Sequence, residues 1–259
     1  MKELLKVADI SKSFYIRQEK QILKNVNMSL FEGIATGLLG ETGSGKTTLA
    51  RLIVGLETPN RGEILFKNKK MPNLRRRKFS DCVDIQYIFQ DPYSALESEA
   101  TVEEVLIEPL KLCKKYNFSS VLTPDKALEV VGIKNYSQWY HRRVHTLSGG
   151  QRQKICIARA IIPRPRLLIA DESTSMLDDE SSDEILEIIG KIKKQFNMAL
   201  LIITHQLKII ERICDRIYIL HNGEIIEQGK AETVLNFPEE VYTKQLLECM
   251  NLFRGVKNE

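Results

Sequence analysis

The chain has 259 residues, of which 43% are hydrophobic, and its formal net charge at pH 7 is +4. Such a chain can bury a full core, and the mild basicity does not indicate a nucleic-acid or lipid surface, so we interpret the basic cluster at residues 75–78 as a solvated loop. The apolar runs are far shorter than the ~18 residues of a membrane span, and the five scattered cysteines suit reduced thiols, which together predict a cytosolic globular protein.

Two early stretches predict an antiparallel pair of strands. Residues 4–10 and 22–30 carry apolar residues in partial alternation with polar ones, as half-buried strands do. Phe14 would lie in the turn between them. Its ring is either a half-buried aromatic or a platform on which a nucleotide base stacks, and the pattern alone favours neither.

The segment Gly40-Glu41-Thr42-Gly43-Ser44-Gly45-Lys46-Thr47 matches the phosphate-loop pattern G-x-x-x-x-G-K-[ST] at every fixed position. An apolar run over residues 34–39 predicts a buried strand before it, and apolar spacing over residues 47–56 predicts a helix after it. Glycines let successive N–H groups turn toward an anion, and the helix adds its positive dipole end. We therefore expect this segment to bind a nucleoside triphosphate.

The polar side chains of the loop suit the parts of a magnesium–triphosphate complex. Lys46 would bind the β- and γ-phosphates, Thr47 would hold Mg²⁺ through its hydroxyl, and Thr48 would donate to a further phosphate oxygen. The predicted ligands are thus ATP and Mg²⁺.

Residues 93–162 are predicted to form a helical insertion. Thr101 and Glu104 have the spacing of a capping box at the start of one helix, which Pro109 should kink or end. No strand pattern interrupts this region.

A second glycine-rich helix start closes the insertion. Ser148 is placed as an N-cap, and Gly149, Gly150 and Gln151 follow it before an apolar helical pattern that Pro163 ends. Unblocked N–H groups at such a start suit an anion, although an ordinary glycine-rich helix start has the same pattern.

Three further predicted strands end in residues suited to phosphate chemistry. These residues are Gln90 after the strand at 85–89, Asp171 and Glu172 after the strand at 167–170, and His205 after the strand at 199–204. Ligands of parallel α/β sheets bind at the carboxyl ends of the strands, so we expect these residues and the phosphate loop at one edge. A solvated acidic pair and a polar cap are the simpler alternatives.

The two adjacent carboxylates cannot share one role, because neighbouring residues of a strand point in opposite directions. One should reach Mg²⁺, and the other should lie near the γ-phosphate, where it accepts a proton from the attacking water or holds that water in line.

The C-terminal part predicts a helix over residues 179–196, whose apolar stripe is core, and then a hairpin. Asn222-Gly223 is a strong signal for the hairpin turn. The tail carries Tyr242 and Leu246 on one helical face, which would dock on the body or on a partner.

Taken together, these motifs resemble the nucleotide-binding subunit of an ATP-binding-cassette (ABC) transporter over nearly the whole chain. The resemblance assigns Phe14 to the aromatic A-loop, Gly40 to Thr47 to Walker A, Gln90 to the Q-loop, Leu147 to Gln151 to the LSGGQ signature, Leu167 to Glu172 to Walker B with Glu172 as the catalytic glutamate, Ser175 to Asp178 to the D-loop and His205 to the switch histidine. In the family, metal contacts fall to Thr47, Gln90 and Asp171.

The resemblance also implies an assembly. Two ATPase subunits, either two copies of this chain or this chain and a paralogue, would pack head to tail, so that Ser148 to Gln151 and Asp178 complete the ATP site of the partner. The dimer would power two membrane permease subunits served by an extracytoplasmic substrate-binding protein. The chain would then lie at the cytoplasmic face of the membrane as a peripheral subunit, without nucleic acid.

The fold class that follows is α/β: a RecA-like phosphate-loop NTPase core with an antiparallel β subdomain and an inserted α-helical subdomain. Residues 1–92 and 163–230 would form the core with the β subdomain, residues 93–162 the helical signature subdomain and residues 231–259 a helical tail.

Within the family, the stretch from Phe89 to Leu96 resembles the FQDPYSSL stretch of peptide, nickel and metallophore importers, and Tyr242 to Leu247 resembles their YTxxLL tail. We therefore expect an importer ATPase. The alternatives are a soluble ABC-type ATPase that acts on DNA or ribosomes, and a generic phosphate-loop kinase, which would leave the signature and His205 unexplained.

Overall fold

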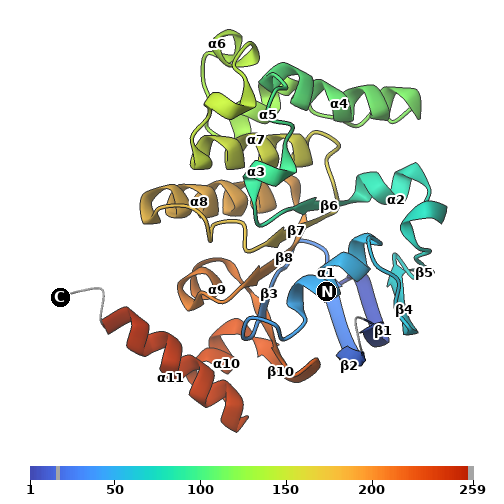
Figure 1. Cartoon of the computed structure of the whole chain (residues 1–259), viewed down its shortest axis with the longest axis vertical. Coiled ribbons are helices and arrows are strands. Elements are labelled where there is room, and N and C mark those ends of the chain that lie inside the picture. The colour runs from blue at the N-terminus through green and yellow to red at the C-terminus, as the bar shows by residue number, and fades with distance from the viewer. Residues whose placement is uncertain (16–17, 256–259) are drawn as a thin grey trace. The chain divides into compact units, whose positions relative to one another are not determined.

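Figure 1 shows the computed structural model of the chain, which describes residues 1–15 and 18–255. The chain divides into two compact units. Met1–Arg77 and Ala199–Glu259 form the first, here called the N/C unit, and Lys78–Met198 form the second, the middle unit. The domain boundaries expected from the sequence motifs stay a prediction.

An antiparallel sheet of four strands, in the order β2-β1-β4-β5, belongs to the N/C unit. Its strands are β1 (Glu3–Tyr15), β2 (Glu19–Phe31), β4 (Arg61–Phe66) and β5 (Lys69–Lys70). The pairing of β1 with β2 confirms the predicted antiparallel pair. The predicted turn at Phe14 is wrong, because the ladder continues through polar residues whose backbone groups pair equally well, and Phe14 lies in β1 opposite Lys20.

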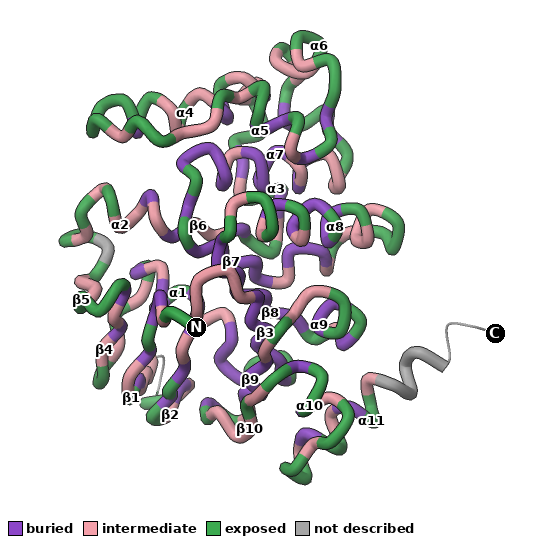
Figure 2. The backbone as a smooth tube through the Cα atoms, turned by 180° about the vertical axis from the view of Figure 1, so that it is seen from behind, coloured by how far each residue is buried: buried purple, intermediate pink, exposed green. Residues whose placement is uncertain are grey.

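The same unit contains the order β10-β9-β3-β8. These strands are β3 (Ala35–Leu39), β8 (Ala199–Thr204), β9 (Arg216–His221) and β10 (Glu224–Lys230). β3 runs parallel to both β8 and β9, and every residue of β3 and β8 is buried, as Figure 2 shows in purple. Such continuous burial explains why both strands read as uninterrupted runs with little polar character.

The predicted hairpin is confirmed between β9 and β10. Asn222 has φ +48° and Gly223 has φ +82°, the left-handed pair that a two-residue hairpin turn requires. The helical segments of the N/C unit are α1 (Lys46–Val54), the 3₁₀ turn η1 (Leu74–Arg76), α9 (Leu207–Ile213), α10 (Ala231–Asn236) and α11 (Val241–Gly255).

Arg77 departs from the expected solvated basic loop. Its guanidinium donates to the carbonyl oxygen of Ile53 at 2.7 Å and to that of Pro72 at 3.0 Å. The helix dipole favours a cation at the last carbonyls of α1, so Arg77 stabilises the C-terminal end of this helix.

The middle unit combines one pair of parallel strands with helices. The strands are β6 (Ile85–Ile88) and β7 (Leu167–Asp171), and the helices are α2 (Phe79–Asp84), α3 (Pro92–Ala95), α4 (Val102–Lys115), α5 (Pro124–Val130), α6 (Tyr136–Tyr140), the 3₁₀ turn η2 (Val144–Thr146), α7 (Gly149–Ile161) and α8 (Asp179–Phe196). The buried residues of α7 lie among α3, α4 and α5. Helices and loops, with one isolated bridge between Thr101 and Arg143, make up residues 93–162, which agrees with the predicted helical character.

Pro109 does not end α4, which continues to Lys115. A proline removes one intrahelical hydrogen bond, but the turns beyond it are held by buried Cys113 and by the N–H of Tyr116, which donates to the carbonyl of Leu112. Tertiary packing has outweighed the local signal. Among residues 1–15 and 18–255, no helix has the length and apolar character needed to cross a membrane.

Candidate nucleotide site

The phosphate loop connects the end of β3 to the start of α1 within the N/C unit. Gly45, the N-cap of α1, has φ +110°, and a side chain at Gly40 would place its Cβ 2.2 Å from the carbonyl oxygen of Leu220. Only glycine satisfies both requirements. Gly45 also brings no side chain that could cap the helix, so the N–H groups of the first turn remain suited to an anion.

Lys46 lies inside this loop and is only 5% exposed. Its ammonium donates to the carbonyl oxygens of Gly40 and Glu41, both at 2.8 Å. The Ser44 hydroxyl is also buried and has no hydrogen-bond partner in the described part of the chain. A buried cation beside an unsatisfied hydroxyl fits a phosphate group, which would accept from both.

His205 follows β8 and is exposed. Thr204, the last residue of β8, lies opposite Leu39, the last residue of β3, in parallel pairing. The phosphate loop and His205 therefore leave neighbouring strands at the same edge of the sheet, as predicted for this pair.

The Phe14 ring is partly buried, and Lys12 Nζ lies 4.5 Å from its centroid. A cation over an aromatic face is a modest favourable contact. This geometry agrees with the half-buried reading of Phe14, and stacking on a nucleotide base stays a prediction.

In the middle unit, Asp171 ends β7 and is 1% exposed. The hydroxyl of Tyr87, on the neighbouring strand β6, donates to Asp171 Oδ2 at 2.5 Å. This charge-assisted hydrogen bond offsets part of the cost of burying a carboxylate.

Glu172 turns the chain away from the strand. Its φ is +43°, a left-handed conformation that is uncommon for residues other than glycine. Its carboxylate accepts from Gln90 Nε2 at 3.0 Å, and its carbonyl accepts from Ser175 N at 3.0 Å and from Ser175 Oγ at 2.9 Å. The structure thus brings together Gln90 and Glu172, two of the strand-end residues predicted to serve phosphate chemistry.

Ser148 caps α7 in a reciprocal capping box. The Gln151 N–H donates to Ser148 Oγ, and the Ser148 N–H donates to Gln151 Oε1, each at 3.3 Å. A Cβ on Gly149 would lie 3.2 Å from Leu177, and one on Gly150 would lie 3.0 Å from the Ser181 hydroxyl. Close packing therefore explains the glycine pair, since neither has positive φ.

Asp178 caps α8. Its Oδ1 accepts the N–H of Ser181 and its Oδ2 accepts the hydroxyl of Ser181, both at 2.8 Å. The backbone N–H of Ser181 is the largest cause that lowers the pKa of the Asp178 carboxyl below its usual value.

Acid should weaken this cap. Because the pKa of Asp178 is lowered in the folded chain, its contribution to stability is complete above the unfolded pKa and is lost as the pH falls through the folded pKa. Asp178→Asn keeps a capping oxygen without the charge. The difference in melting temperature between wild type and this variant, followed by circular dichroism, should shrink between about pH 7 and about pH 3. A difference that stays constant over this range would contradict the role of the charge.

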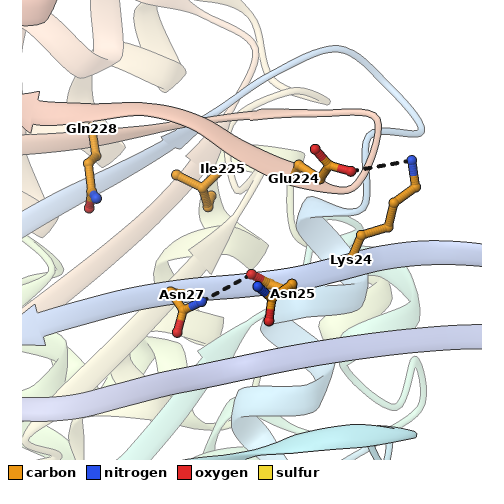
Figure 3. Close-up of a pocket in the computed structure, with 6 residues that line it drawn as sticks. All are labelled: Lys24, Asn25, Asn27, Glu224, Ile225 and Gln228. Atoms are coloured by element: carbon orange, nitrogen blue, oxygen red, sulfur yellow. Dashed lines mark hydrogen bonds and ion pairs between the residues drawn. The ribbon is translucent and has the colours of Figure 1, made fainter.

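A groove between β2 and β10 lies apart from the phosphate loop. It is lined by Lys24, Asn25, Asn27, Glu224, Ile225 and Gln228 (Figure 3). Lys24 Nζ and Glu224 Oε1 are 3.5 Å apart, and Asn27 Nδ2 donates to the Asn25 carbonyl at 3.1 Å. None of the predicted ATP-binding residues lines it.

A parallel strand that leads into a glycine-rich loop, with a helix that begins at the loop lysine, defines the class of phosphate-loop NTPases. The ABC transporter family model matches residues 23–175, more than half of the chain. This chain belongs to the ABC transporter family.

Known relatives agree. The chain is 36% identical over 245 residues to the nickel import ATP-binding protein NikE of Escherichia coli O6:K15:H31, covering 92% of this chain and 91% of the relative. It is 33% identical over 263 residues to the oligopeptide transport ATP-binding protein OppF of Lactococcus lactis subsp. lactis, covering 96% of this chain and 81% of the relative. The recognition of an importer-type ATP-binding subunit is thereby confirmed.

Solved structures confirm the fold class. The cbiO1 protein from Clostridium perfringens, part of the ABC transporter complex cbiONQ, has a TM-score of 0.77 and 27% identity over 97% of this chain and 100% of its own. The ATP-binding cassette MJ0796, solved as a dimer in a post-hydrolysis state bound to ADP and Pi, has a TM-score of 0.74 and 25% identity over 88% of this chain and 99% of its own.

Tyr87 is a site residue that the sequence patterns do not single out. Its signal was weak, because a tyrosine in an apolar strand reads as core. Only the pairing of β6 with β7 shows that Tyr87 lies opposite Ile169 and reaches Asp171.

Proposed function

We propose that this chain is the ATP-binding and ATP-hydrolysing subunit of an ABC importer that carries nickel, peptides or metal–chelator complexes. The observation that carries this proposal is the buried ammonium of Lys46 inside the glycine loop, held by two carbonyl oxygens at 2.8 Å. The relatives named for nickel and oligopeptide import support the choice of import over action on DNA or ribosomes.

The phosphate loop would bind the β- and γ-phosphates of ATP. Its backbone N–H groups and the Lys46 ammonium are the donors, and Thr48 adds a hydroxyl. Phe14 would stack on the base. By resemblance to the family, Ser148 to Gln151 and Asp178 would contact the ATP that is bound to the partner subunit. The capping box keeps Ser148 and Gln151 in a fixed mutual orientation.

Mg²⁺, when bound, neutralises charge on the phosphates, and the oxygens of Thr47, Gln90 and Asp171 are ligands of the type it prefers. Glu172 would accept a proton from the attacking water or orient it, and His205 would contact the γ-phosphate. The hydrogen bond from Gln90 Nε2 fixes the orientation of the Glu172 carboxylate.

The proposed assembly has a second ATPase subunit, which is a copy or a paralogue, two membrane permeases and an extracytoplasmic substrate-binding protein. The dimeric form of a cassette with a similar fold supports the paired ATPases. In this assembly the chain lies on the cytoplasmic face of the membrane as a peripheral subunit.

Purification tests the importer function. The tagged chain, expressed with permeases encoded beside it, should co-purify with them in detergent and hydrolyse ATP faster in that complex than alone. Saturable binding to DNA or ribosomes at physiological salt, without permease binding, would instead favour the alternative class.

Two inactive variants should complement each other if two copies of this chain pair head to tail. Ser148→Arg blocks the signature, Lys46→Ala blocks the phosphate loop, and in a mixed dimer both defects fall in one of the two sites. Equal mixing should therefore restore roughly a quarter of wild-type turnover if sites act independently. ATPase rates of each variant and of the mixture provide the measurement. If the mixture is as inactive as its components while both variants still form dimers, self-pairing is excluded.

A further inference from the structure

The C-terminal helix α11 lies in the N/C unit next to α10 and contacts α9 (Figures 1 and 2). Leu247 of α11 shares a buried cluster with Val234 of α10 and with Leu39, the last residue of β3. In the first turn of α11, the Tyr242 ring lies on His221, with 3.7 Å between the ring centroids and 34° between their planes. The tail therefore reaches the turn between β9 and β10.

The hairpin lies close to one end of the phosphate loop directly and to the other end through β2. The carbonyl oxygen of Leu220, the residue before His221, is the atom that leaves no room for a side chain at Gly40. On the other side, Gly223 packs on the Ile22 carbonyl oxygen, which also lies 3.1 Å from the Cβ position of Gly45. A displacement of His221 would therefore shift the backbone that packs on Gly40 and, through Ile22, on Gly45.

The Tyr242 hydroxyl also reaches the loop. It is buried and lies against Glu41, whose backbone and side chain both act on it, while no hydrogen bond of full geometry joins the two residues. Burial and then the Glu41 carboxylate raise the pKa of Tyr242, so its hydroxyl keeps its proton. The carbonyl of Glu41 in turn accepts from Lys46 Nζ at 2.8 Å and from the Ser44 N–H at 3.2 Å.

We propose that Tyr242 is a positioning residue for the phosphate loop, which it holds through His221 on one side and Glu41 on the other. Docking of α11 and binding of nucleotide are then coupled, and each strengthens the other. This inference rests on the proposed binding of ATP to the loop.

Nucleotide affinity of the full chain, measured by isothermal titration calorimetry with Mg²⁺-ATP and with ADP, tests the coupling. Tyr242→Phe removes the hydroxyl and keeps the ring, and should weaken both nucleotides about threefold, while Tyr242→Leu also removes the ring and should weaken them about tenfold. Val234→Ala is the control, because it destabilises the same buried cluster without touching His221 or Glu41.

Hydrogen–deuterium exchange gives a readout that a merely structural tyrosine would not change. In the wild type, ATP should slow the exchange of amides in α11 as well as in the phosphate loop. In Tyr242→Leu the slowing in the loop should persist at saturating ATP, whereas the slowing in α11 should be lost.

The outcomes separate two failures. If the wild type binds no ATP, the proposed function is wrong. If the wild type binds ATP and both Tyr242 variants bind it equally well, or if Val234→Ala weakens binding as much as Tyr242→Leu, the positioning role is overturned while the proposed function stands.

Discussion

Replacing Lys46 with alanine should lower the rate of ATP hydrolysis by about 10²–10³-fold or more, because a fixed cation for the developing phosphate charge is lost. The side chain is almost fully buried, and its ammonium holds the carbonyls of Gly40 and Glu41. The variant therefore removes both the charge and the internal support of the loop. Steady-state phosphate release with saturating Mg²⁺-ATP measures the effect.

Lys191→Ala is a suitable control for this experiment. Lys191 lies on α8 with an exposed side chain, 3.7 Å from Glu187, so the variant removes one positive charge without changing the loop. It should keep the wild-type rate. Turnover of Lys46→Ala close to that of this control would exclude the phosphate loop as the working site.

Replacing Glu172 with glutamine should stop hydrolysis and leave ATP binding intact. Loss of a positioned general base costs about 10²–10⁴-fold in rate. Gln90 Nε2 can still donate to the amide oxygen of the new residue. The backbone strain at φ +43° is the same for glutamine as for glutamate, so the variant changes the charge and keeps the geometry. With ATP present, the variant should remain dimeric in size-exclusion chromatography.

Glu187→Gln provides the matched control, since it makes the same chemical change at an exposed position of α8. It should hydrolyse ATP at the wild-type rate and should not accumulate a dimer. A monomeric Glu172→Gln chain that has bound ATP would count against Glu172 as the base.

The phosphate loop could be predicted residue by residue, because its glycines and its lysine stand at fixed spacings within eight consecutive residues. Gly40 and Gly45 are dictated by backbone conformation and close approach, and the flanking strand and helix follow from apolar spacing. The hairpin at Asn222 and the cap at Ser148 were predictable for the same reason, since each depends on residues within a few positions.

Contacts between distant segments could not be predicted. The hydrogen bond from Gln90 to Glu172 depends on a left-handed residue at the end of β7, which sequence patterns rarely reveal for glutamate. The approach of Tyr242 to Glu41 joins the C-terminal helix to the phosphate loop, two segments about 200 residues apart in the sequence. The helical pattern of α11 indicated only a docked face. The path of α4 through Pro109 shows the same priority of packing over local preference.

The way the N/C unit is divided along the chain has a consequence for biosynthesis. β3 lies between β8 and β9, yet the ribosome adds the whole middle unit before it makes either neighbour. At about 5–20 residues per second, this strand, every residue of which is buried in the folded chain, waits roughly ten to thirty seconds for its partners. The continuous middle unit can fold meanwhile, so chaperone demand during translation should centre on the first segment to emerge.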